Sequence, residues 1–180
     1  MISASRRERY RGVALAAYGY LVTRTVRVRW STVPANSQGM WSCWHEHILA
    51  ATIAFLAVST EPPPVIVTLE TPRGRTTTYA YGLLGGQTIR LTDHEKRGDR
   101  ASSTRDIVNT LRSGRACLMT LDGARGPFRI GRGGAERAAS RARTEIHVVE
   151  LEVIGKLRLR RWDRLIVPLP FARISVRPGH

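Results

Sequence analysis

Short apolar runs alternate with segments of helical pattern along most of this chain. Residues 64–69, 87–91 and 116–119 are apolar runs of strand length, and residues 76–84 between the first two have a helical pattern. Such alternation is typical of βα units, in which helices cover the faces of a sheet. The pattern predicts an α/β fold with a mixed central sheet flanked by helices.

The C-terminal half adds two helices and two strands to this prediction. Ser103 is a natural N-cap after a charged loop, and Gly114 is the expected stop of that helix. Residues 133–143 combine small residues with arginines on the outer face of a helix, whereas residues 146–153 and 173–177 alternate as strands do. At 180 residues with 42% apolar content, the chain is expected to form a single domain.

The first 40 residues differ from the rest in composition. A stretch rich in arginine is followed by the apolar residues 13–22, which are too few to span a bilayer, since that takes about 20 residues. No small-residue cleavage site follows, so a cleaved signal peptide is not expected. We expect residues 1–40 to be a basic segment that faces a membrane or a partner, and residues 41–180 to be the α/β domain.

The formal net charge of +15 comes from 29 basic and 14 acidic residues, and nearly all of the basic residues are arginines. Arginine favours planar, bidentate contacts with phosphate or carboxylate groups, so anionic partners are expected. These are nucleic acid, acidic lipid headgroups, a phosphate-bearing substrate or an acidic protein surface. The few aromatic residues do not interleave with arginines as stacking platforms do, which argues against nucleic acid.

Both cysteines lie in stretches that are expected to be buried. Cys43 and Cys117 are surrounded by apolar residues, so a disulfide framework is not expected and a reducing compartment fits. We therefore expect an intracellular, cytoplasmic protein.

The most informative motif follows the apolar run at 116–119. Residues 120–127 read TLDGARGP, which places Asp122, two glycines and Arg125 directly after a predicted buried strand. Ligands bind at the carboxyl ends of strands in α/β sheets, where glycines admit an anion and arginine holds it. A tight turn is the alternative, since Asp-Gly is common turn chemistry. The further basic residues Arg129 and Arg132 favour a site.

Cys43, His45 and His47 occupy alternate positions and would share one face of an extended segment. Zinc would need a fourth ligand, which only the distant Asp93 or His94 offers, so no metal site is expected. Two interpretations remain. The residues belong to a buried strand, or His45 acts as a general base on a substrate hydroxyl.

Residues 162–164 read WDR and are interpreted as structural. An aspartate between a tryptophan and an arginine most often makes a local ion pair that fixes a connection. The neighbouring arginines at 158, 160 and 161 are interpreted as facing solvent or lipid headgroups.

Four segments stand in a recognisable order. They are Trp44-His45 before an apolar helix, Arg73-Gly74 after a strand, the TLDGARGP motif, and RWDR at 161–164 with PLPF at 168–171. In order and spacing they resemble the lysophospholipid acyltransferase-like superfamily, in particular a compact bacterial branch long catalogued as a domain of unknown function. The resemblance runs from residue 41 to the end.

The resemblance implies an acyltransferase-like α/β fold and a histidine that deprotonates an acceptor hydroxyl. The hydroxyl then attacks the thioester of acyl-coenzyme A or acyl carrier protein, which are substrates, so no cofactor is implied. His45 matches that histidine. Arg73 falls where the superfamily binds the acceptor phosphate. The acceptor pocket is matched by Asp122, Gly123 and Arg125, with Arg129 as a further anion contact and Asp122 close to His45.

One position departs from the superfamily pattern. Most members have an acid five positions after the histidine, where this chain has Ala50. That acid normally orients the imidazole and stabilises its charged form. Either another acid, such as Glu46 or Asp122, takes over this role, or the protein is a weak or lapsed enzyme. The stretch 70–75, ETPRGR, also differs from the more polar sequence usual in this branch.

Two functions follow from the resemblance. The first is a peripheral O-acyltransferase at the cytoplasmic face of the inner membrane, acting on a lysolipid-type hydroxyl and bound to an anionic bilayer. The second is a catalytically silent relative that serves as a basic structural or binding subunit of a larger, membrane-associated complex.

Overall fold

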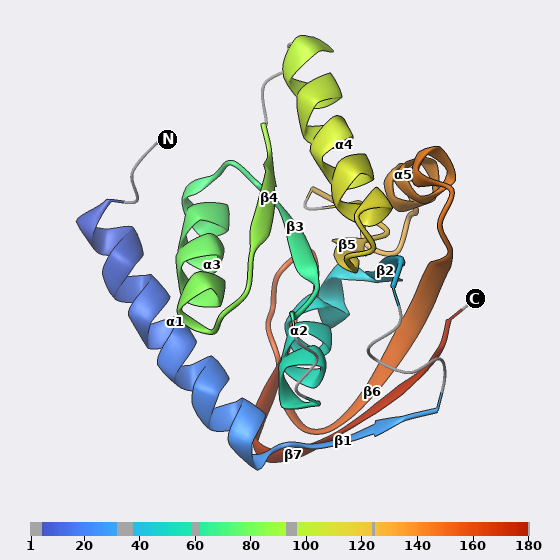
Figure 1. Cartoon of the computed structure of the whole chain (residues 1–180). Helices are drawn as coiled ribbons and strands as arrows, with labels where there is room; N and C mark the ends of the chain where they lie inside the picture. Colours follow the sequence, from blue (N-terminus) through green and yellow to red (C-terminus); the bar gives the residue numbers. More distant parts are fainter. Residues whose placement is uncertain (1–4, 32–37, 59–61, 93–96, 124, 180) are drawn as a thin grey trace.

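The computed structural model describes residues 5–31, 38–58, 62–92, 97–123 and 125–179 (Figure 1). A seven-stranded sheet has the order β1-β7-β6-β2-β5-β3-β4. The strands are β1 (Arg27–Trp30), β2 (Met40–Cys43), β3 (Val65–Leu69), β4 (Thr88–Leu91), β5 (Cys117–Thr120), β6 (Ile146–Arg158) and β7 (Ile166–Pro178). The helices are α1 (Arg6–Thr25), the 3-10 helix η1 (His45–His47), α2 (Ile48–Ala57), α3 (Pro72–Leu83), α4 (Arg97–Arg112) and α5 (Gly134–Ala142).

The sheet is mixed in strand direction. β6 and β7 form an antiparallel pair, and every other pair of neighbouring strands is parallel. The carboxyl ends of β2, β3, β4, β5 and β6 therefore lie along one edge of the sheet. The predicted single α/β domain with a mixed, helix-flanked sheet is confirmed.

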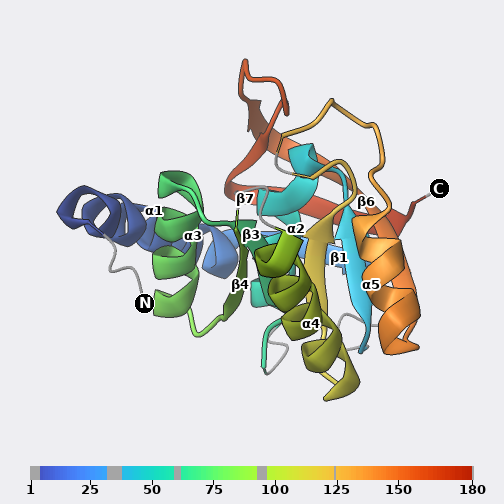
Figure 2. The same cartoon turned by 90° about the horizontal axis from the view of Figure 1, so that it is seen from above.

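Helices cover both faces of the sheet (Figure 2). Successive residues of β2 point to opposite faces, as the pleat requires, so Met40 packs beneath α4 and α5 whereas Trp41 packs against α2. Cys117 and Leu118 of β5 divide between the same two clusters. Each of these two strands contributes side chains to both hydrophobic clusters. Its sequence is therefore a continuous apolar run rather than an alternation of apolar and polar residues.

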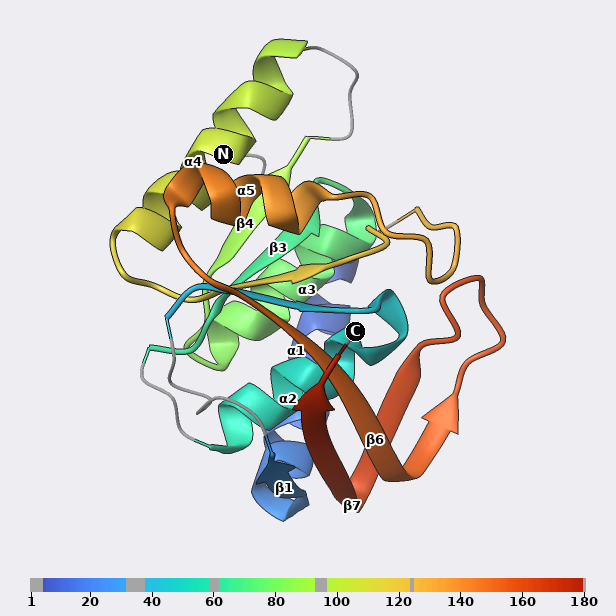
Figure 3. The same cartoon turned by 90° about the vertical axis from the view of Figure 1, so that its right-hand side faces the viewer.

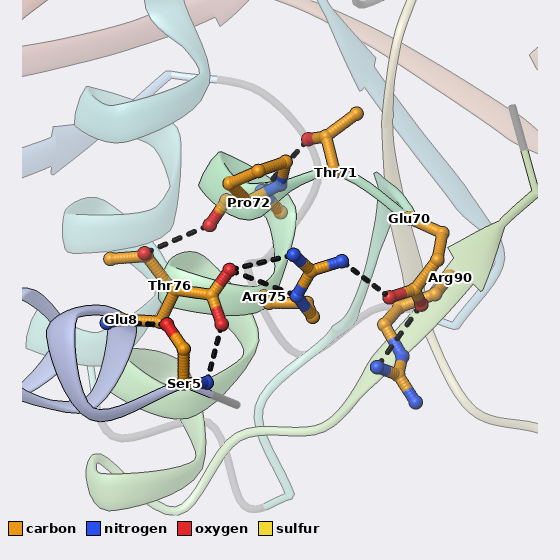
Figure 4. A network of polar contacts seen from close by, with 9 residues as sticks. Ser5, Glu8, Glu70, Thr71, Pro72, Arg75, Thr76 and Arg90 are labelled. Carbon is orange, nitrogen blue, oxygen red and sulfur yellow. Dashed lines mark hydrogen bonds and ion pairs between the residues drawn. The ribbon is translucent and has the colours of Figure 1, made fainter. Parts of the chain in front are cut away.

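Residues 5–31 are built into the fold. α1 lies along the outer side of α3, and β1 pairs with β7 at the edge of the sheet. Ser5 and Glu8 form a capping box at the start of α1. Glu8 also binds the Arg75 side chain, with 2.7 Å between Oε1 and an Nη atom, and Arg75 in turn reaches Glu70 (Figure 4). The expected membrane or partner contact of this segment stays a prediction.

α3 begins four residues earlier than predicted. Thr71 is its N-cap and accepts a hydrogen bond from the backbone N–H of Gly74 (3.1 Å), while Pro72 occupies the first helical turn. Gly74 approaches the Leu69 carbonyl so closely that no side chain would fit. The first turn of α3 could not be predicted from apolar periodicity, because it is determined by an N-cap, a proline and a close contact between backbone segments.

The C-terminal elements are longer than their sequence patterns. β6 and β7 each have 13 residues, beyond the predicted 146–153 and 173–177, because their far ends pair as a two-stranded ribbon that projects from the sheet (Figure 3). A register shift at Gly155, whose φ is +81°, interrupts the alternation there. α4 begins at Arg97 rather than after Ser103, and residues 93–96 lie outside the described ranges.

Candidate active site

Three connections meet at the carboxyl edge of the sheet (Figure 3). They are the turn after β2, which contains His45; the loop at 121–133 after β5; and the connection at 159–165 between β6 and β7. Connections at this edge converge because the parallel strands all end there.

Asp122 and His45 lie together, as the sequence predicts. The backbone N–H of His45 donates to Oδ1 of Asp122 (2.9 Å), and the backbone N–H of Arg129 donates to Oδ2 (3.2 Å). Asp122 is fully buried. Its carboxylate therefore ties the start of η1 to the 121–133 loop and contacts backbone N–H groups rather than the imidazole ring.

Asp163 is the carboxylate that faces the His45 ring. Its Oδ2 lies 3.8 Å from Nε2 of His45 and accepts a hydrogen bond from the Arg161 guanidinium (2.8 Å). Its Oδ1 accepts from the backbone N–H of Leu165 (3.3 Å), and the residue is fully buried. The predicted local ion pair exists, with Arg161 as the partner, but the interpretation of Asp163 as purely structural missed its position beside His45.

Trp162 and Gly126 join the 121–133 loop to the 159–165 connection. The Trp162 ring lies over the His45 ring, with 5.3 Å between centroids. A Cβ on Gly126 would lie 2.6 Å from the Trp162 ring, too close for a side chain. Gly126 also has a φ of +66°, a backbone conformation that favours glycine, so two independent reasons require glycine here. Arg164 lies over the Phe128 ring at 4.7 Å and adds a second contact between the two segments.

The surroundings of His45 favour the neutral imidazole. Burial lowers its pKa below the ordinary value of 6.5, and Arg161 lowers it further. The carboxylates of Asp163 and Asp122 and the Gly123 backbone counteract this in part. Within the described ranges, the buried Nδ1 atom has no hydrogen-bond partner of good geometry. A histidine that is neutral at pH 7 can accept a proton.

Glu46, one of the acids expected to replace the missing carboxylate, is held by two arginines. Its Oε1 binds Arg129 through Nε (2.7 Å) and an Nη atom (2.6 Å), and Oε2 lies 3.5 Å from Arg158. Glu46 is buried, whereas 44% of the Arg129 side chain is exposed. Arg129 thus has one carboxylate partner already, and part of its side chain remains exposed.

The other predicted substrate-binding residues lie at the same edge of the sheet. Arg73 is exposed in the first turn of α3, after β3, and β3 is separated from β2 by β5. Gly123 adopts a left-handed backbone conformation with φ +66° directly after Asp122. Arg125 is exposed farther along the same loop. Their roles in binding stay predictions.

The extended segment proposed for Cys43, His45 and His47 is wrong. The chain leaves β2 at Cys43 and turns into η1 at His45, so alternate residues do not share a face. Burial, followed by the charge of Asp122, raises the pKa of the Cys43 thiol far above its ordinary range. Among the described residues, no group of three histidine, cysteine or acidic side chains is placed to hold a metal ion.

A hollow of about 380 Å³ lies beside the site, on the side of His47 rather than His45. His47, Arg129, Glu150 and Arg158 are among the residues that line it. His45 and Asp122 do not line this hollow, so it is not a binding pocket for a substrate of His45 in this conformation.

The sheet order and the position of this site at the carboxyl edge define an α/β domain with an acyltransferase-like fold. Among solved structures, the chain is similar to the crystal structure of the 1-acyl-sn-glycerophosphate (LPA) acyltransferase PlsC from Thermotoga maritima. The similarity covers 99% of this chain and 72% of that chain, with a TM-score of 0.51 and 14% sequence identity. At that identity, the likeness concerns the fold.

Part of the chain is also similar in sequence to a curated protein that is described as uncharacterized. The uncharacterized protein RP090 of Rickettsia prowazekii (strain Madrid E) is 31% identical over 75 residues, which are 42% of this chain. The match spans 34% of that protein, about a third of its length. No family model matches the chain.

Proposed function

We propose that this protein is an O-acyltransferase of the lysophospholipid acyltransferase-like superfamily. It transfers an acyl chain from a thioester donor, acyl-coenzyme A or acyl carrier protein, to a lysolipid-type hydroxyl. The observation that carries the proposal is His45: an imidazole with a lowered pKa, fixed through its backbone to Asp122, at the carboxyl edge of an acyltransferase-like sheet.

His45 serves as the general base in this reaction. It accepts the proton of the acceptor hydroxyl while the hydroxyl oxygen attacks the thioester carbonyl carbon. The carbon–sulfur bond then breaks, and the departing thiolate takes the proton from the imidazolium. A positioned base of this kind contributes roughly a hundred- to ten-thousand-fold in rate.

Arginines at the same edge supply contacts for an anionic acceptor. Arg73 and Arg125 are exposed, and the side chain of Arg129, on the loop that follows Asp122, is partly exposed. Guanidinium groups bind phosphate in a bidentate manner. Gly123 lets the backbone of the loop come close to such a group.

We further propose that the protein binds the anionic cytoplasmic face of the inner membrane through α1. The outer face of this helix exposes apolar side chains at helical spacing, and Phe171, 78% exposed, lies beside its last turn, where its N–H donates to Thr25 Oγ1. Within the described ranges, none of the helices has the length and apolar character of a transmembrane span. The exposed side chains of this face are Tyr10, Val13, Tyr20 and Leu21.

A catalytically silent subunit of a membrane-associated complex is the second candidate function. Asp122 is fully buried, Trp162 covers the His45 ring, and the Nδ1 atom of His45 is buried. An acceptor hydroxyl reaches that nitrogen only when the covering atoms move apart. A filled site of this kind fits a fold that is kept for binding.

Transfer assays with a matched pair of histidine variants separate the two functions. Purified protein would be given acyl-coenzyme A or acyl carrier protein and lysophosphatidate in anionic vesicles. His45→Ala is expected to lower the transfer rate on the order of 100- to 10,000-fold, while the neighbouring His47→Ala costs much less. A folded wild-type protein that transfers from neither donor would contradict the enzyme, and a copurifying membrane polypeptide would support the subunit.

A further inference from the structure

Position 50, where the superfamily pattern expects an acid, lies in an apolar environment. Ala50 is fully buried in α2, within the cluster that contains Trp41, Ile53 and Phe55. A carboxylate at this position would lose its hydration among apolar side chains. If His45 has an acid partner, that partner must come from another element.

Two nearby acids are already committed to other groups. Both oxygens of Asp122 accept backbone N–H groups, from His45 and Arg129. Glu46 is paired with the guanidinium groups of Arg129 and Arg158. Among the described residues, neither carboxylate forms a hydrogen bond or an ion pair with the imidazole ring, although the charge of Asp122 raises the pKa of that ring.

Asp163 has the position and the support that such a partner needs. Its Oδ2 lies 3.8 Å from Nε2 of His45, within the range in which an opposite charge stabilises an imidazolium. Arg161 and the N–H of Leu165 hold the carboxylate in place although it is fully buried. Hydrogen bonds between catalytic groups are often longer without substrate and tighten in the complex.

We propose that Asp163 is the positioning residue of His45, replacing from the β6–β7 connection the acid that Ala50 lacks. This inference rests on the proposed function for its catalytic meaning. Asp163 faces Nε2 and therefore selects the tautomer that carries its proton there. Nδ1 is then the nitrogen that accepts the hydroxyl proton, and because it is buried it does so only when the atoms around it move apart as the acceptor binds. Asp163 and Arg161 from the 159–165 connection and Asp122 from the end of β5 are the charged groups that act on the ring.

Nitrogen-15 NMR of the wild-type protein tests the tautomer without any variant. Above the pKa of His45, the ring is expected to carry its proton on Nε2, with Nδ1 bare. A proton on Nδ1 would overturn the proposal. This measurement does not depend on activity, so it stands even if no acyl transfer is found.

Asp163→Asn tests the charge. The pKa of His45 is expected to fall by about one unit or more when its carboxylate neighbour is neutralised. Loss of structure would instead raise this pKa toward 6.5, so the sign of the shift separates the two effects. Asp106→Asn, on the exposed face of α4, is the matched control and should leave the value unchanged. An unchanged His45 pKa in folded Asp163→Asn would overturn the proposal.

Kinetics complete the test if the protein is active. Asp163→Asn is expected to lower kcat on the order of 100- to 10,000-fold while KM for the acceptor changes little, because the residue acts on the base and not on the substrate. A variant in which KM alone rises would assign Asp163 to acceptor binding and overturn the positioning role. If Asp163→Asn does not fold, the tautomer of the wild-type protein decides.

Discussion

Burial governs the chemistry of His45 more than any single neighbour does. Because burial is the largest influence on its pKa and lowers it, the ring is mostly neutral at pH 7 and charges only in more acidic solution. The folded state then binds fewer protons than the unfolded chain, so His45 contributes stability above pH 6.5 that is lost as the pH falls toward the folded-state pKa.

Ala50→Asp is expected to destabilise the protein rather than activate it. The sequence alone favours this change as a repair of the histidine–acid pair, whereas the structure places Ala50 in an apolar cluster and Asp163 beside the ring. An unpaired buried carboxylate should lower the free energy of unfolding by about 3–5 kcal/mol. Urea denaturation measures this loss, with Ala57→Asp at the less buried end of α2 as the control. Faster transfer at unchanged stability would contradict this account.

Strands were predictable from the sequence where they form short apolar runs. The strands predicted at 64–69, 87–91 and 116–119 match β3, β4 and β5 within two residues, because all three are short runs rich in apolar residues, and β3 and β5 are buried at their first two positions. Their carboxyl-end loops follow from topology, which is why the approach of Asp122 to His45 was predictable.

The missed features depend on contacts distant in sequence or on exposed backbone. The far half of β6, Ile154 to Arg158, is exposed and begins at the bulge, so its length has no alternating signature. Because the β6–β7 ribbon carries Asp163, its position beside His45 was missed as well. The only signal available was the WDR segment itself, an acid within the set of motifs that carries the resemblance.

Glu8 couples the stability of the α1–α3 pair to pH. The Arg75 hydrogen bond, followed by that of the Ser5 backbone, lowers the pKa of Glu8 from 4.5 to about 2 (Figure 4). Its stabilising contribution is therefore complete above pH 4.5 and is lost as the pH falls toward 2. Thermal unfolding should show Glu8→Gln less stable than wild type at pH 6, with a narrower gap at pH 3 that closes toward pH 2.

An exposed ion pair provides the control for this pH dependence. Glu152 pairs with Arg177 at 2.7 Å, and both side chains are more than half exposed, so Glu152→Gln should change little at either pH. A Glu8→Gln gap of the same size at pH 6 and pH 3 would mean that the carboxylate charge is not what joins the two helices.

For the whole molecule, the charge of +15 and the apolar outer face of α1 predict binding to anionic bilayers. Flotation with phosphatidylglycerol vesicles should recover the protein at low salt, and phosphatidylcholine vesicles should not, because each arginine near the surface contributes about 1 kcal/mol. Val13→Asp should weaken binding, whereas Leu83→Asp, equally exposed on α3, is the control. Equal recovery with both lipids, or with neither, would contradict a membrane-facing α1. The arginines expected to contribute are Arg6, Arg7, Arg9 and Arg11.

Asp163 lies between β6 and β7, so the proposed site is assembled only when this hairpin has been synthesised. In the proposed pairing, the histidine lies on the turn after β2, whereas its acid lies on the connection between β6 and β7. A nascent chain can form the β2–α2 turn early, since synthesis proceeds from the N-terminus. In the proposed site, the imidazole meets its carboxylate only after the β6–β7 ribbon has emerged from the ribosome, so a product truncated before this ribbon would keep the histidine without its positioning acid.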